Sequence, residues 1–173
     1  YPISLTQERY LLLRSFVLCL IFIGIDQITK ALVVADILHG ERIKVIPGIF
    51  NLTYITNPGA AWGILAGKGN LLLIISGIVF CLAIYFIRTL CEGWKERYYA
   101  VFMVLSGIIG NSLDRVFRGS VVDFLDFHFF DKYHWPSFNV ADSCICAGVF
   151  IFVISSLLRP QPRPQQAYVN SNR

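Results

Sequence analysis

Residues 69–87 read GNLLLIISGIVFCLAIYFI, a run of 19 positions without a charged side chain. With a rise of about 1.5 Å per residue, a helix over this run is nearly as long as the hydrocarbon core of a bilayer, which is about 30 Å thick. A run of this length and composition is typical of a transmembrane helix and not of an amphipathic helix on a soluble protein. The stretch therefore predicts a protein embedded in a membrane.

The composition of the whole chain agrees with that prediction. Of the 173 residues, 55% are hydrophobic and 15% are charged, and the mean hydropathy is +0.60. Soluble domains contain about 25% charged residues. These values exclude a disordered chain, a small disulfide-stabilised protein and a cytosolic globular enzyme. The net charge of +4 is small and scattered along the chain, so no nucleic-acid partner is expected.

Three other stretches pass the same length test. The first covers residues 15–25 and continues past Asp26 to Thr29, and the others cover residues 98–113 and 143–158. Each can cross most of the hydrocarbon core when helix tilt and interfacial residues are included. We therefore expect a membrane α-helical protein with four transmembrane helices.

The distribution of basic residues predicts the orientation of these helices. Four spans place both termini on one side of the membrane. The segments 1–14, 88–97 and 159–173 carry eight basic residues in 39 positions, whereas 30–69 and 114–139 carry seven in 66. Because cytoplasmic loops carry an excess of lysine and arginine, we expect both termini to be cytoplasmic.

The two outer connections contain segments that resemble strands. Residues 49–56 (IFNLTYIT) are rich in β-branched and aromatic side chains between two Pro-Gly pairs, and residues 119–130 (GSVVDFLDFHFF) form a strand or an interfacial segment. We expect a small extramembrane β-platform on the outer face. A single membrane domain is predicted over residues 1–158. A disordered cytoplasmic tail, rich in proline, glutamine and asparagine, is predicted over residues 159–173.

Aspartate residues are confined to the outer side of this topology. In it, Asp26 and Asp114 close helices and Asp142 opens one, so carboxylates from distant parts of the chain reach one membrane level. A charged carboxylate at this depth costs about 2–3 kcal/mol, so it needs a partner or a function. Helix capping suits Asp142, but near a helix C-terminus a negative charge opposes the helix dipole. The seven aspartates are Asp26, Asp36, Asp114, Asp123, Asp126, Asp131 and Asp142.

Two carboxylates that share one site can carry out hydrolysis without a metal. Because both cannot ionise at low cost, the pair holds one proton and offers a base and an acid together. The base takes a proton from a water molecule that attacks a carbonyl, and the acid protonates the carbonyl oxygen or the leaving amine. An aspartate pair at the membrane edge is therefore suited to cleaving a peptide bond.

Other catalytic chemistries lack their usual residues. The chain has three histidines and no H-E-x-x-H or Cys/His spacing of the kind that binds zinc. It contains no G-x-S-x-G nucleophile motif, no P-loop and no G-x-G-x-x-G motif. We therefore expect neither a metal nor another cofactor.

Five short motifs in chain order resemble those of the signal peptidase II family, the lipoprotein signal peptidases. The sequence differs mildly from the family pattern at Thr56, Pro58 and Trp62, and none of these differences removes a carboxylate. The motifs are DQITK at 26–30, NPGAAW at 57–62, GNSLDR at 110–115, VVDF at 121–124 and FNVADS at 138–143.

The resemblance implies an aspartic endopeptidase of the bacterial inner membrane, with Asp123 and Asp142 as the catalytic pair and an active site at the periplasmic leaflet. Its substrates would be prolipoproteins that carry diacylglycerol on a cysteine, and cleavage would occur on the amino side of that cysteine. Membrane lipid and globomycin-type inhibitors are the other implied partners, and we expect a monomer. The residues implied to bind substrate or support the site are Asp26, Asn57, Gly59, Asn111, Asp114, Arg115 and Asn139.

Two other functions remain open on the residues alone. One is a proton- or cation-coupled transporter that uses Asp26, Asp114 and Asp142, and the other is a non-catalytic membrane protein that binds lipopeptides. Lys30 is expected to extend toward the lipid headgroups, and Arg115 to pair with Asp114 or with substrate. We expect solvated surface positions for Asp36, Asp126, Asp131, His128 and His134.

Overall fold

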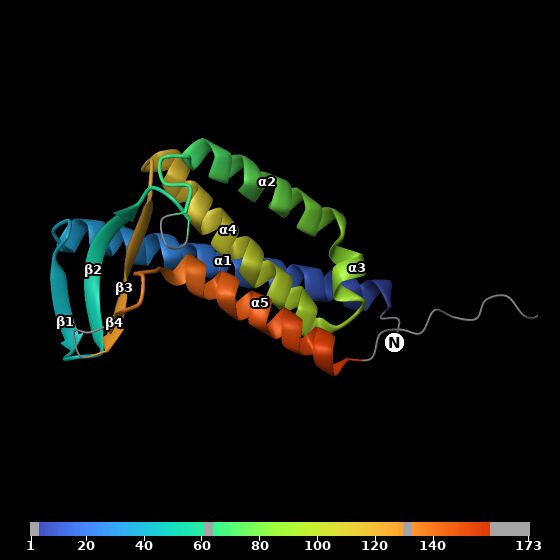
Figure 1. The fold of residues 1–173 in the computed structure, drawn as a ribbon. Coiled ribbons are helices and arrows are strands. Elements are labelled where there is room, and N and C mark those ends of the chain that lie inside the picture. The colour runs from blue at the N-terminus through green and yellow to red at the C-terminus, as the bar shows by residue number, and fades with distance from the viewer. Residues whose placement is uncertain (1–3, 61–63, 130–132, 160–173) are drawn as a thin grey trace, which may run out of the picture.

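The computed structural model describes residues 4–60, 64–129 and 133–159 as a helical bundle with a small sheet at one end (Figure 1). The short helix α3 lies between α2 and α4 at the end of the bundle opposite the sheet. The predicted tail lies outside the described residues from position 160 onward. The helices are α1 (Leu5–Asp36), α2 (Gly69–Tyr85), α3 (Ile87–Cys91), α4 (Lys95–Phe117) and α5 (Val140–Leu158).

Three of these helices, α1, α4 and α5, are long and apolar enough to cross a membrane. Helix α2 is a shorter apolar helix of 17 residues, so the predicted count of four spanning helices is matched in part. Helix α1 is 32 residues long and continues to Asp36. Asp26 therefore lies inside α1 and does not close it, because the chain stays helical past Thr29 to the sheet.

The outward faces of the helices are apolar, as a lipid environment requires. On α2 the exposed side chains include Ile74, Ile78 and Leu82, whereas Leu72 is its one buried residue. A water-soluble protein rarely exposes so large an apolar surface. Lipid tails solvate these side chains as well as a protein core does, so the bundle gains nothing by covering them.

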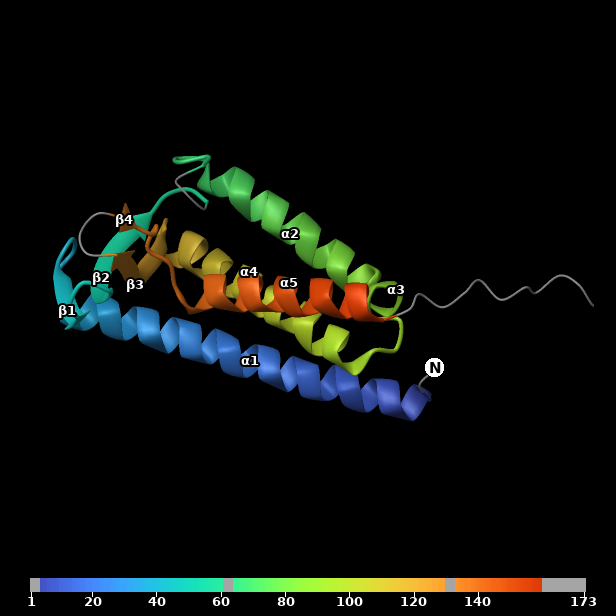
Figure 2. The ribbon, with the colours of Figure 1, turned by 60° about the horizontal axis from the view of Figure 1, so that its bottom comes forward.

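The sheet confirms the strands expected in the two outer connections. Its four antiparallel strands are ordered β1-β2-β3-β4, and it lies at the end of the bundle where α1 ends and α5 begins (Figures 1 and 2). The strands are β1 (Arg42–Ile46), β2 (Phe50–Asn57), β3 (Val121–Phe129) and β4 (Tyr133–His134).

Strand β3 alternates between two faces, and this alternation fixes where its acidic residues lie. Val122 and Phe124 pack against Val33 and Ile37 near the end of α1. Asp123 points to the opposite face and pairs in register with Ile55 of β2. The sheet is therefore attached to α1 by one face of β3 and presents Asp123 on the other.

The same alternation corrects two expectations for polar side chains. Asp126 and His128 follow Phe124 on its face of β3 and are 2% and 3% exposed, so they are buried and not solvated. Asp126 accepts a hydrogen bond from Asn51 Nδ2 at 3.0 Å. Asp36 is exposed, as expected. Asp131 and the side chain of His134 lie outside the described part of the chain.

Helices α4 and α5 form the closest contact in the bundle, because glycines let their backbones approach. A Cβ atom at Gly107 would lie 2.2 Å from the carbonyl oxygen of Ala141, and one at Gly148 would lie 2.6 Å from that of Ala100. Helix pairs in membranes use small residues in this way. The contact sets the spacing between the C-terminal half of α4 and the first turn of α5.

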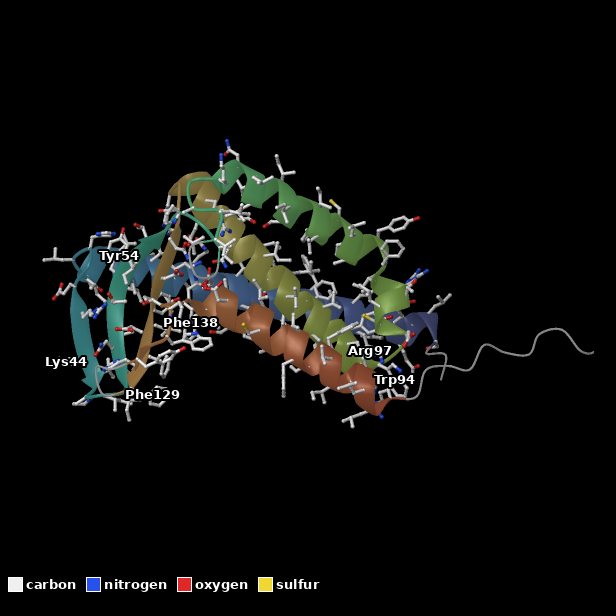
Figure 3. All side chains as sticks on the ribbon, viewed as in Figure 1. Lys44, Tyr54, Trp94, Arg97, Phe129 and Phe138 are labelled. Atoms are coloured by element: carbon white, nitrogen blue, oxygen red, sulfur yellow. The ribbon has the colours of Figure 1, made fainter. Side chains whose placement is uncertain are left out.

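Charged side chains join the helices at the end far from the sheet. Arg88 pairs with Glu8 at 2.9 Å, and Arg159 lies over the ring of Trp94, 4.4 Å from its centroid. Figure 3 shows Trp94 and Arg97 at this end, with Tyr54 and Lys44 at the other. Helix α1 begins and α5 ends here, on one end of the bundle (Figure 2).

Candidate active site

Two carboxylates meet where the sheet joins the bundle, and one asparagine contacts both of them. Asn139 is the N-cap of α5: its Oδ1 accepts from Asp142 N at 2.9 Å, and Asp142 Oδ2 accepts from Asn139 N at 3.2 Å. Asn139 Nδ2 donates to Asp123 Oδ1 at 2.8 Å. Asp142 therefore takes part in capping α5, and the cap side chain also contacts the second carboxylate.

Two further asparagines donate to the remaining carboxylate oxygens. Asn57, at the end of β2, donates to Asp123 Oδ2 at 3.1 Å, and Asn111, on α4, donates to Asp142 Oδ1 at 2.7 Å. All four carboxylate oxygens therefore accept an N–H group. Asn57 Oδ1 in turn accepts from Gly59 N at 2.9 Å, which fixes the direction in which its amide points.

The electrostatic environment favours one proton on Asp123. This side chain is 4% exposed. Burial, and after it the negative charge of Asp142, raise the pKa of Asp123 to about 7, although the hydrogen bonds from Asn57 and Asn139 act in the opposite direction. Near neutral pH the two carboxylates are therefore able to share a single proton, which is the state that acid–base hydrolysis requires.

A buried ion cluster lies directly behind the carboxylate pair. Lys30 Nζ lies 2.8 Å from Asp26 Oδ2 and 2.8 Å from Asp114 Oδ2, and all three side chains are at most 1% exposed. Asp26 Oδ1 accepts from Ala141 N at 2.8 Å, and Asp114 Oδ2 accepts from Val122 N at 3.1 Å. The cluster therefore joins α1 and α4 to the starts of α5 and β3.

Lys30 corrects an expectation, because it is fully buried and does not reach the headgroups. A buried carboxylate without a cation is strongly destabilising, and two carboxylates lie beside this lysine. Lys30 lies four residues after Asp26 on one helix, and this spacing was the sequence signal that the two side chains could form an ion pair. Composition alone does not distinguish a buried lysine from one that extends along the lipid.

Arg115 also differs from its expected pairing with Asp114. Its guanidinium donates to the carbonyl oxygens of Gly59 at 3.0 Å and Asn111 at 3.2 Å, and its Nε is buried without a hydrogen-bond partner among the described residues. Asp114 pairs instead with Lys30 and with Arg118, which lies one helical turn beyond it. Arg115 therefore fastens the segment after β2 to α4.

The structure brings all nine predicted site residues to this junction. Sequence reasoning missed Lys30 and also Gln27, whose Nε2 donates to Asp26 Oδ2 at 3.1 Å. Trp62 lies outside the described residues. Among the residues that the structure does describe, no group of three or more His, Cys, Asp or Glu side chains is placed to hold a metal ion.

The chain is similar to known proteins over most of its length. A family model described as signal peptidase (SPase) II matches residues 18–158. The chain belongs to the signal peptidase II family. The lipoprotein signal peptidase of Bacillus pumilus (strain SAFR-032) is 40% identical over 145 residues, which are 83% of this chain and 92% of that protein. That of Syntrophotalea carbinolica (strain DSM 2380) is 40% identical over 155 residues, 88% of this chain and 93% of that protein.

Two solved structures are similar in fold to this chain. Both are bacterial membrane enzymes solved by the in meso method. The first has a TM-score of 0.78 and 35% identity and covers 83% of this chain and 87% of its own. The second has a TM-score of 0.76 and 34% identity and covers 86% of this chain and 94% of its own.

Family membership confirms the activity predicted from the five motifs. As a signal peptidase II, the protein is a bacterial membrane enzyme, an aspartic peptidase that removes signal peptides from prolipoproteins. The transporter and the binding-only alternatives are not favoured. Of the three helices that can span a membrane, α4 and α5 carry part of the site directly, and α1 carries the ion cluster behind it.

Proposed function

We propose that Asp123 and Asp142 are the catalytic pair of this peptidase and that they cleave on the amino side of a diacylglyceryl-modified cysteine. The observation that carries the proposal is the asparagine that bonds both carboxylates, at 2.8 Å to Asp123 and 3.2 Å to Asp142. This shared asparagine supports the idea that the two carboxylates, which come from β3 and α5, act as one hydrogen-bonded unit.

Asp142 is the base in this proposal, and Asp123 is the acid. The anionic form of Asp142 is favoured by the amide of Asn111, by the backbone N–H of Asn139 and by its place in the first turn of α5. The raised pKa of Asp123, about 7, supports its holding the shared proton. In this assignment Asp123 starts with the shared proton, and Asp142 accepts a proton from water.

The reaction proceeds in two proton-balanced steps. Asp142 takes a proton from water as the water oxygen bonds to the scissile carbonyl carbon, and Asp123 gives its proton to the carbonyl oxygen. The tetrahedral intermediate then collapses: the carbonyl re-forms and returns its proton to Asp123, the carbon–nitrogen bond breaks, and Asp142 transfers its proton to the leaving amine. Both carboxylates regain their starting states, and no metal or covalent intermediate is needed.

The residues around the pair have separate roles in this proposal. Asn57, Asn111 and Asn139 orient the carboxylates and line the substrate pocket, together with Gly59 and Arg115. The Nε of Arg115 is buried and has no hydrogen-bond partner among the described residues, which supports a role in binding a substrate carbonyl. Asp26 and Asp114 support the pocket from behind, because they hold the first residues of α5 and β3.

A separate part of the proposal concerns how the protein lies in the membrane. We place α2 as a fourth spanning helix, both termini in the cytoplasm and the site at the periplasmic leaflet of the inner membrane. The apolar exposed face of α2 supports a fourth span, and the common end at which α1 begins and α5 ends supports termini on one side of the membrane. The excess of basic residues in segments 1–14, 88–97 and 159–173 supports a cytoplasmic location for that side. Residues 1–158 would then form a single domain that works as a monomer, in contact with lipid.

Globomycin-type peptide inhibitors are the remaining expected ligands. A compound that occupies the carboxylate pair in place of water would compete with the lipidated substrate. Its affinity would then fall when Asp123 or Asp142 is replaced. Competition with the lipidated precursor in a cleavage assay would test this expectation.

Cleavage of a lipidated precursor tests the catalytic pair. Purified enzyme in lipid vesicles is mixed with a diacylglyceryl prolipoprotein, and the released signal peptide is quantified. Asp123→Asn and Asp142→Asn should each lower kcat by at least about 10³-fold, since each removes a proton-transfer step. Asp36→Asn, which changes an exposed aspartate at the end of α1, is the matched control and should cleave normally.

Two further outcomes bear on this experiment. Near-normal cleavage by both folded variants would contradict the two-aspartate mechanism. Equal cleavage of precursors with and without diacylglycerol would contradict the proposed substrate class. Thermal unfolding of each purified variant shows whether it has folded.

A further inference from the structure

The buried lysine behind the site has three hydrogen-bond partners, and one of them is an asparagine of the catalytic unit. An ammonium group has three N–H donors and no acceptor. Lys30 Nζ reaches Asp26 Oδ2 and Asp114 Oδ2 at 2.8 Å each and Asn111 Oδ1 at 3.1 Å. All three donors are therefore used, and the side chain is 0% exposed, so it does not contact substrate or water.

The contact with Lys30 determines which way the Asn111 amide points. Asn111 Oδ1 accepts from Lys30 Nζ and, at 3.2 Å, from Asn139 Nδ2. With its oxygen held by two donors, the Asn111 amide turns its Nδ2 toward Asp142 Oδ1, 2.7 Å away. The opposite orientation would place an NH₂ group against an ammonium and an oxygen against a carboxylate oxygen, which is unfavourable at both ends.

We propose that Lys30 is a positioning residue of the carboxylate pair, which acts through Asn111 to keep Asp142 in the anionic form that activates water. The inference rests on the proposed function, since it assigns Asp142 as the base. Lys30 also places a positive charge near Asp142 in a site of low polarity, where charge interactions are strong. The amide orientation and the charge both favour the anion.

Replacing the lysine tests the proposal through the pH dependence of cleavage. Lys30→Met keeps an unbranched side chain, one heavy atom shorter than lysine, and removes its charge and its donors. Asp142 then becomes easier to protonate, so the acid limb of the kcat/KM profile should move to higher pH by about one unit. At neutral pH, kcat should fall by up to about tenfold, the largest loss that a shift of one pH unit allows, while KM stays within about twofold, because the pocket surface is unchanged.

Two further variants separate positioning from folding. Lys30→Met leaves Asp26 and Asp114 short of a cation, so the double variant Lys30→Met/Asp26→Asn restores the charge balance in the cluster. Arg118→Met is the matched control, because Arg118 pairs with the same Asp114 carboxylate but not with Asn111. Arg118→Met should leave the acid limb where it is in the wild type.

Asn111→Ala leaves the ion pairs of Lys30 with Asp26 and Asp114 in place. It removes only the amide through which Lys30 acts on Asp142. It should show the same shift of the acid limb as Lys30→Met. In the Asn111→Ala background, Lys30→Met should lower kcat by less than about twofold more, because residues that act in series are not additive. If neither Lys30 variant folds, an unchanged acid limb in Asn111→Ala still overturns the proposal.

Several outcomes would overturn the proposal. They are an unchanged acid limb in a folded Lys30 variant or in Asn111→Ala, an equal shift in Arg118→Met, or full additivity of Lys30→Met and Asn111→Ala. Each of these leaves the proposed function intact if the wild type cleaves and Asp142→Asn does not. A wild type that fails to cleave the lipidated precursor would instead remove the proposed function itself.

Discussion

Three asparagine side chains point their NH₂ groups at the two carboxylates because each amide oxygen is already held by another donor. The oxygen of Asn57 accepts from a turn N–H, that of Asn139 from the first turn of α5, and that of Asn111 from Lys30. Their NH₂ groups are left to face Asp123 and Asp142. An amide that could rotate freely would also turn its oxygen toward the carboxylate, which repels it. The contact that holds each asparagine oxygen therefore matters as much as the hydrogen bond to the carboxylate.

The raised pKa of Asp123 predicts an alkaline limit to activity. Asp123 must be protonated to act as the acid, so kcat/KM should fall about tenfold per pH unit above pH 7, where it loses this proton. Asn57→Ala removes a hydrogen bond that favours the charged form and should move this limb to higher pH. Cleavage rates between pH 5 and 9 measure both effects.

The exposed Asn70 at the start of α2 provides the control for this measurement. Asn70→Ala should leave the alkaline limb in place. A profile that stays flat to pH 9 in the wild type would mean that Asp123 is not the acid.

At the scale of secondary structure, the contact between α4 and α5 sets the geometry of the site. Asn111 lies one turn after Gly107 on α4, and Asp142 follows Ala141 in the first turn of α5. The backbone approach at Gly107 and the contact between Asn111 and Asp142 are therefore parts of one interface. A helix pair held this closely positions side chains more accurately than a loop does.

Gly107→Ala should separate the two helices. The added Cβ would lie 2.2 Å from a backbone oxygen of α5, which cannot move without moving the helix. Overpacking of this kind costs about 1–3 kcal/mol, so thermal unfolding in detergent should occur at lower temperature and cleavage should weaken as the Asn111–Asp142 contact lengthens.

Gly77 on α2 supplies a matched substitution. A Cβ atom there meets nothing within 4 Å, so Gly77→Ala should be neutral or should stabilise the helix by about 0.5–1 kcal/mol. Equal unfolding temperatures for the two variants would show that the α4–α5 contact is not tightly packed.

For the molecule as a whole, charge and apolar surface are separated along the bundle. The sheet and the carboxylate pair occupy one end, and ion pairs such as Arg88–Glu8 occupy the other. Exposed leucine, isoleucine and valine side chains lie on the helices between them. This separation matches the layers of a bilayer, with water on both sides of a hydrocarbon core.

Reporter fusions test whether α2 crosses the membrane. Alkaline phosphatase is active only when exported, so a fusion after Lys68, at the sheet end, should be active and a fusion after Gly93, beyond α3, should be inactive. A fusion after Asp36, at the end of α1, should also be active and checks that α1 is inserted. Equal activity at positions 68 and 93 would show that α2 does not cross.

Local sequence pattern determined the class of protein, the apolar helices and the strands, and it supplied the candidate residues of the site. Uncharged runs such as residues 69–87 and alternation such as that of residues 121–129 report the environment of each segment, whatever it packs against. The five motifs are also short contiguous stretches, so the candidate carboxylates could be recognised in the sequence without knowledge of the packing.

Only the tertiary structure decided which side chains meet. Lys30 is buried and not lipid-facing because Asp114, 84 positions later in the chain, comes to lie against it. Asp126 is buried because β3 turns that face away from solvent, and Arg115 bonds Gly59 because β2 ends beside α4. These contacts depend on how the helices and the sheet pack. Packing brings together residues that are far apart in the chain, and no local pattern in the sequence shows which of them will meet.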